Sequence, residues 1–137
     1  MVWHLRSQLN RPSPMKSHPE HLSRGQKAEA YALNYLQQKG LKLVTRNYRW
    51  RGGEIDLVLR DGCALVFVEV RLRSNPRYGG ALASIDPGKQ RRLIQSAQHY
   101  LCHHAVDSAT RFDVVALTPA GKEFEVNWIR DAFQATP

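Results

Sequence analysis

Two acidic residues lie inside apolar stretches of the sequence, where carboxylates are rarely found. Asp56 lies in the segment 54–58 (EIDLV) and Glu69 in the segment 66–70 (VFVEV). Burying a carboxylate without a partner is costly, so such residues usually ligate a cation or pair with a base. Carboxylate oxygens are the donors that Mg²⁺ and Mn²⁺ prefer. Two acids on one side of a hairpin could therefore share a divalent ion. The alternative is a set of ion pairs with the nearby arginines 49, 51 and 71.

Both acids are predicted to belong to one antiparallel hairpin. Segments 54–59 and 64–71 have the apolar content of strands, and Asp61-Gly62 between them is typical of a hairpin turn. If the turn is centred between Asp61 and Gly62, Asp56 lies opposite Phe67. Glu69 follows Phe67 by an even step, so the two acids point to the same side of the sheet. The residues expected on the other, core-facing side of the first strand are Ile55, Leu57 and Leu59.

The remaining segments predict an α/β fold with a mixed β-sheet of about five strands flanked by helices. Ser23 and Gln26 form a capping-box pattern at the start of a helix that Gly40 ends. Asp86-Pro87 predicts the start of a second helix, which reaches about His103. A helix between the third and fourth strands implies a parallel pair with a right-handed crossover. The expected strands are 41–49, 54–59, 64–71, 112–117 and 124–129, and 72–85 is expected to be a loop.

Composition and chain organisation limit the class of protein. The 137 residues are 42% hydrophobic, which is typical of a globular protein. Residues 1–23 are interrupted by prolines and predict a disordered basic tail, and 24–137 is expected to be a single domain. No apolar run is long enough for a membrane-spanning helix, so no membrane association is expected. The cysteines, Cys63 and Cys102, have no zinc-site spacing and are expected to be buried, reduced thiols of a cytoplasmic protein.

A net charge of +8 and a pI near 9.9 favour a polyanionic partner, of which nucleic acid is the commonest. Basic residues flank the two acids in the sequence and are expected to contact a phosphate backbone. The sequence lacks the pattern of a helix-turn-helix or a zinc finger, so binding without base recognition is favoured. The residues predicted to bind nucleic acid are Arg46, Arg49, Arg51, Arg73, Arg77, Lys89, Arg91 and Arg92.

Five short runs in order along the chain carry a family resemblance. They are GQKAEA at 25–30, RNYR at 46–49, GGEIDLV at 52–58, VFVEVR at 66–71 and KQRRL at 89–93. With them, residues 24–134 resemble the YraN-type family of bacterial proteins. That family is similar in fold to the PD-(D/E)xK restriction endonucleases and to archaeal Holliday-junction resolvases. The resemblance implies a restriction-endonuclease-like sheet.

The resemblance also implies roles for individual residues. Asp56 and Glu69 match the strand acids that bind catalytic Mg²⁺ or Mn²⁺, and Glu29 matches an acid that the first helix contributes in resolvase-like members. Gln90 matches a polar residue close to that site. The superfamily usually has lysine where this chain has Arg71. Arginine cannot act as a base, but it can hold a phosphate through two hydrogen bonds.

Three functions are compatible with these features. The first is a metal-dependent DNA endonuclease that acts on branched or damaged DNA. The second is a nucleic-acid-binding module of the same fold with little or no catalysis, which Arg71 favours. The third is an interaction protein whose basic face meets an acidic partner. Resolvases cut as symmetric dimers, so the resemblance implies a homodimer. The histidines 99, 103 and 104 are expected to be a solvated cluster that complements a helix dipole.

Overall fold

The computed structural model describes residues 22–73 and 85–135 of the chain. The helices are α2 (Arg24–Gln38) and α3 (Pro87–His103). The strands are β1 (Lys42–Trp50), β2 (Gly53–Asp61), β3 (Ala64–Leu72), β4 (Thr110–Ala120) and β5 (Glu123–Phe133). Each predicted helix and strand is present, with bounds that differ by a few residues. The predicted disordered tail and most of the predicted loop fall outside the described residues.

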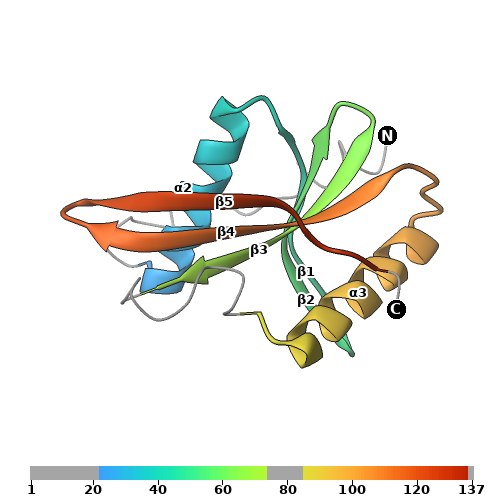
Figure 1. Cartoon of the computed structure of the whole chain (residues 1–137). Helices are drawn as coiled ribbons and strands as arrows, with labels where there is room; N and C mark the ends of the chain where they lie inside the picture. The colour runs from blue at the N-terminus through green and yellow to red at the C-terminus, as the bar shows by residue number, and fades with distance from the viewer. Residues whose placement is uncertain (1–21, 74–84, 136–137) are drawn as a thin grey trace.

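The strands form one mixed sheet in the order β1-β2-β3-β4-β5. β3 and β4 are parallel, as the crossover predicted, and every other neighbouring pair is antiparallel. The predicted α/β class with a five-stranded mixed sheet is confirmed. Figure 1 shows α2 and α3 on different sides of this twisted sheet, with the long β4–β5 hairpin extending past α2.

Each helix covers one face of the sheet with its apolar side. Helix α2 begins with the predicted capping box, in which Ser23 and Gln26 bond to each other's backbone amides at 2.9 and 3.1 Å. Its buried residues pack on Leu57, Leu59 and neighbouring strand residues in a first core cluster. Helix α3 is capped by Asp86, whose carboxylate accepts a hydrogen bond from the Lys89 amide. Its buried residues Ala97 and Tyr100 pack on the other face in a second cluster, and Leu93 packs in a small third one.

The register of the β2–β3 hairpin differs from the prediction by two residues. Asp61 pairs with Ala64, so the loop consists of Gly62 and Cys63. Gly62 has a φ of +61°, a conformation that glycine adopts without steric cost, and this places the turn later than predicted. Phe67 consequently lies opposite Val58 instead of Asp56. A shift of two residues leaves the side of each residue unchanged.

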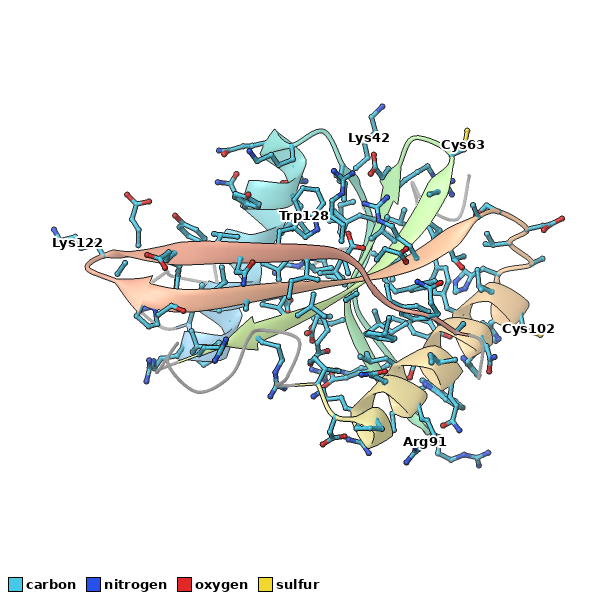
Figure 2. All side chains as sticks on the ribbon, viewed as in Figure 1. Lys42, Cys63, Arg91, Cys102, Lys122 and Trp128 are labelled. Carbon is cyan, nitrogen blue, oxygen red and sulfur yellow. The ribbon has the colours of Figure 1, made fainter. Side chains whose placement is uncertain are left out.

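Two further predictions are wrong. Ile55 packs in the second cluster, whereas Leu57 and Leu59 pack in the first, so the three do not share one face. Both cysteines are exposed, because Cys63 lies in the hairpin loop and Cys102 on the outer side of the last turn of α3. Figure 2 shows both thiols directed away from the molecule. Neither described helix is long and apolar enough to cross a membrane.

Candidate active site

The first feature of the site is a shared irregularity in β1 and β2. Asn47 in β1 has a φ of 52°, in the left-handed region that asparagine tolerates better than most residues. Its neighbours Arg46 and Tyr48 pair with Leu57 and Ile55 of β2, so Asn47 lies opposite Asp56. Ile55 and Leu57, on either side of it, pack in clusters on opposite faces of the sheet. Regular alternation would put both on one face, so the strand changes face at Asp56.

The Asp56 carboxylate bonds to the backbone of β3. The β2–β3 ladder ends at Leu57 and Val68, and the next residues are Asp56 on β2 and Glu69 on β3. Oδ2 of Asp56 accepts the Val70 amide at 2.8 Å. A strand amide past the end of the ladder is thereby satisfied, and the acid is held beside β3. The charge of Glu69 acts on Asp56, so the two acids that strand spacing predicted to be neighbours lie near each other.

Glu69 is buried and carries two basic partners. Its side chain is only 8% exposed, and Oε2 lies 3.1 Å from Nζ of Lys89 and 3.6 Å from Nη1 of Arg71. Lys89 comes from the first turn of α3, which Asp86 caps. Both cations are about one-third exposed. They can therefore neutralise Glu69 and still reach an anion at the surface.

Glu29 extends the cluster from α2. Its carboxylate is 3.3 Å from Nη2 of Arg46 and accepts the side-chain amide of Asn47 at 3.1 Å. Its negative charge acts on Asp56 across the space between α2 and the sheet. The three acids that the resemblance implied therefore lie around one site, and each has a cation or a backbone amide as its partner.

The electrostatics of the site are dominated by crowding of negative charge. Burial is the largest cause that raises the pKa of Asp56 from 3.8 to about 7, and the charge of Glu69 is the second. Glu29 raises the pKa of Asp56 further, whereas the bond from the Val70 amide lowers it. At neutral pH the Asp56 carboxyl is thus part protonated. A nearby cation would stabilise the ionised form of this carboxyl.

The donor chemistry fits a hard divalent ion. Asp56 and Glu69 offer carboxylate oxygens past the end of the β2–β3 ladder, and the crowding of negative charge favours a cation there. Within 22–73 and 85–135, no three or more His, Cys, Asp or Glu side chains form a ready-made ligand set. A metal would therefore rely on two carboxylates, with a backbone carbonyl, water and substrate completing its shell.

Gln90 and the residues predicted to bind nucleic acid differ in their surroundings. The Gln90 amide donates to the Ile85 carbonyl at 3.0 Å, which commits it to the start of α3. Some of the predicted basic residues pair with acids: Arg46 with Glu29, Arg49 with Glu54 and Lys89 with Glu69. Exposed positions are held by Arg51, Arg91 and Arg92. Arg91 points away from the sheet in Figure 2. The Arg73 amide donates to Leu117, and Arg77 lies outside the described residues.

Sequence reasoning missed the contact between Lys89 and Glu69. The run of basic residues after Asp86-Pro87 indicates phosphate contacts and carries no sign of an ion pair between Lys89 and Glu69. The cap at Asp86 fixes which residues occupy the first turn, but it does not show the position of that turn relative to β3. Only the crossover packing brings the Lys89 ammonium to the acid.

Comparison with known proteins identifies relatives over most of the chain. The model of the family described as "Uncharacterised protein family UPF0102" matches residues 28–117. A UPF0102 protein of Methylococcus capsulatus is 54% identical over 111 residues, covering 81% of this chain and 90% of that protein. A UPF0102 protein of Stutzerimonas stutzeri is 48% identical over 118 residues, covering 85% of this chain and 98% of that protein. One of Nitrosomonas europaea is 50% identical, covering 81% and 93%.

Proposed function

Since the chain belongs to the uncharacterised protein family UPF0102, of which YraN is a member, we propose its function from its own site: a metal-dependent DNA endonuclease. The observation that carries the proposal is the meeting of Asp56 and Glu69 past the end of the β2–β3 ladder, with Lys89 and Arg71 on Glu69. Acids that hold a cation next to basic groups that hold a phosphate are what phosphodiester hydrolysis requires.

Asp56 and Glu69 would hold Mg²⁺ or Mn²⁺. When bound, the ion supplies positive charge that polarises the scissile phosphate and the attacking water. The Val70 amide fixes the orientation of Asp56, and the bond from β3 keeps its carboxylate beside Glu69. Glu29 adds negative charge from α2, which strengthens the attraction for a cation.

The basic partners of Glu69 act on the substrate. The guanidinium of Arg71 can donate two hydrogen bonds to a phosphate, so its role is to hold a phosphate oxygen as negative charge develops. Lys89 offers an ammonium beside the same carboxylate, on the side of α3. Lys89 could therefore take the role of the lysine that the superfamily usually has at the position of Arg71. Its ammonium is suited to orient a water or a phosphate.

Charge elsewhere on the molecule supports a nucleic-acid substrate. The net charge is +8, and Arg51, Arg91 and Arg92 are exposed. Binding that relies on phosphates suits a branched or damaged DNA, since shape rather than base sequence is read. We place such an activity in the cytoplasm, and the need for paired cuts in a junction favours a homodimer.

A binding module without catalysis is the second candidate. Glu69 is already neutralised by Lys89 and Arg71, and a metal would have to compete with both. In that case Asp56 and Glu69 serve the fold, and the basic surface alone provides the function.

A cleavage panel tests the proposal. Labelled duplex, single-stranded and four-way-junction DNAs are incubated with protein and Mg²⁺, Mn²⁺ or EDTA. We expect cutting of at least one DNA with a metal, none with EDTA, and none by Asp56→Asn. Salt-dependent binding without cutting of any DNA would support the binding module. No binding at low salt would support the third candidate, an interaction protein.

Single-turnover rates separate the roles of the two basic residues. We expect Lys89→Met and Arg71→Ala each to lower the rate by roughly 10²–10³, as for other preorganised charge donors. Lys122→Met, at the tip of the β4–β5 hairpin in Figure 2, is the matched control and should cut normally. Normal cutting by Lys89→Met would remove Lys89 from the site's chemistry.

A further inference from the structure

A stack of three aromatic rings lies at the junction of β1 and α3. The Trp50 ring and the His99 ring have centroids 4.3 Å apart and planes inclined by 19°. His99 and His103 continue the stack at 5.4 Å and 12°. His99 and His103 are one helical turn apart, so the spacing of α3 lines up their rings. His103 and His104 are exposed at the end of α3, as the sequence predicted, whereas His99 is partly buried in the stack.

Hydrogen bonds hold the inner two rings in place. Nε1 of Trp50 donates to the Ser96 hydroxyl at 2.7 Å, and the Tyr48 hydroxyl lies 2.5 Å from Nδ1 of His99. The turn after Trp50 is close to its ring, because a Cβ at Gly52 would lie 2.4 Å from the indole. The stack is therefore preorganised, which lowers the entropy that a ligand's ordering would cost.

The stack lies outside the described hydrophobic core. Trp128 packs against the first core cluster, whereas Trp50 is a member of none of the clusters formed by residues 22–73 and 85–135. Trp50 and His99 are partly buried, and His103 is exposed at the outer end. An aromatic surface fixed at the protein surface is typical of a binding site that takes a flat, partly polar ligand.

The setting of the stack selects a nucleobase as that ligand. Arg51 directly follows Trp50 and is exposed. Arg92, which is also exposed, lies on α3 one turn before Ser96. Aromatic rings next to such cations are the combination that binds single-stranded nucleic acid, where each stacked base contributes about 1–3 kcal/mol. Lys89 and His99 are ten residues apart on α3, which is about 15 Å along the axis. That spans about four nucleotides at the axial rise of one strand of duplex DNA.

We propose that Trp50, His99 and His103 form a stacking platform for an unpaired nucleobase, several nucleotides from the Asp56–Glu69 site. The base lies against the exposed ring of His103 and extends the stack. The strand's phosphates lie toward Arg51 and Arg92. This inference rests on the proposed function and narrows the substrate to DNA or RNA with an unpaired segment beside the cutting position.

Binding in EDTA tests the platform without relying on cleavage. Fluorescence anisotropy compares a labelled single strand of thymidine or uridine nucleotides with a blunt duplex at one low salt concentration. We expect His103→Ala to weaken single-strand binding roughly 5- to 20-fold, in line with the loss of one stacked base, and duplex binding less than 2-fold. His103→Tyr should bind the single strand at least as tightly as the wild type.

Matched variants separate stacking from charge and from folding. His104→Ala removes a neighbouring imidazole that stacks on Tyr100 and meets the His103 ring only edge-on, at 5.7 Å, so it should leave single-strand affinity within 2-fold. Trp50→Phe keeps a ring at the inner end and should weaken single-strand binding less than His103→Ala does. The melting temperature of each variant is measured as a control for folding. Because His103 is exposed and contributes little to packing, we expect His103→Ala to leave it nearly unchanged.

The outcomes also separate this inference from the proposed function. Equal losses on single strand and duplex for His103→Ala, or no loss on either, would overturn the platform even if the protein cuts DNA. Selective loss on the single strand would support the platform even if no DNA is cut. Absence of binding to every nucleic acid at low salt would overturn both.

Discussion

Asp56 is the residue on which the environment of the site acts most strongly. Burial and the charges of Glu69 and Glu29 raise its pKa to about 7, while the Val70 amide opposes them. A carboxyl whose pKa is raised in the folded protein binds a proton that the unfolded chain has released. The folded state therefore loses stability as pH rises from about 4 to 7.

The first prediction concerns Asp56→Asn in metal-free protein. The amide keeps the shape of the side chain without its charge, so we expect the variant to be more stable than the wild type at pH 8, by about 2–4 kcal/mol. At pH 4, where the Asp56 carboxyl is already protonated, the two proteins should have nearly equal free energies of unfolding. Urea unfolding at pH 4 to 8 measures this difference. A difference that does not change with pH would show that the pKa of Asp56 is not raised.

At the scale of elements, the site depends on the change of face in β1 and β2 at Asn47 and Asp56. Strand spacing predicted that Asp56 and Glu69 lie on one side of the sheet, and the two-residue error in register does not alter that prediction, because it preserves parity. It could not predict the change of face at Ile55, because that depends on the left-handed Asn47 in the neighbouring strand. An asparagine in a strand is a weak signal of a left-handed conformation, but it does not show where the strand changes face.

The helices were predicted more completely than the site they support. Ser23 and Asp86 are local capping signals, and local sequence is enough to find them. The contact of Lys89 with Glu69 and the stacking of Trp50 on His99 join residues far apart in sequence. Such contacts follow from how α3 packs on the sheet, which no local pattern specifies.

The β4–β5 pair is held by a buried acid, and this gives the second prediction. Asp113 is 1% exposed and accepts hydrogen bonds from Arg111, Trp128 and the Asp131 amide. Asp113→Ala removes the acceptor of the Trp128 indole and the Asp131 amide, and leaves Arg111 with Asp61 as its remaining partner. We therefore expect a loss of about 3–5 kcal/mol in the free energy of unfolding. The matched control is Asp107→Ala at an exposed position, which should change stability by less than about 0.5 kcal/mol. Urea unfolding at pH 7 measures both, and equal small effects would contradict a structural role for Asp113.

At the scale of the whole molecule, the basic residues differ in whether they are available to bind phosphates. Arg46 and Lys89 form ion pairs with acids of the site, whereas Arg91 and Arg92 are exposed on α3. Figure 2 shows Arg91 at the lower edge of the view, on α3, and Lys122 at the far left, at the β4–β5 tip. If phosphates lie along α3 toward the site, only the first of these two cations contacts them.

The third prediction follows from this distribution of charge. Arg91→Ala should weaken duplex binding and reduce the slope of log K against log salt concentration by about one. Lys122→Ala should leave both the affinity and the slope nearly unchanged. Anisotropy titrations in EDTA at several salt concentrations measure both variants. The same loss in the two variants would show that charge acts over the whole surface instead of along α3.

The central claim is that Asp56 and Glu69 together hold a divalent ion, and calorimetric titration of the protein with Mn²⁺ tests it most directly. We expect one Mn²⁺ per chain in the wild type. At pH 6 binding should release close to one proton, because Asp56 is protonated there before the ion binds, and less at pH 8. The heat measured in buffers of different ionisation enthalpy gives that number. The double variant Asp56→Asn, Glu69→Gln should bind no Mn²⁺ in the same range. Equal binding by the wild type and the double variant, or no binding by the wild type, would contradict the claim.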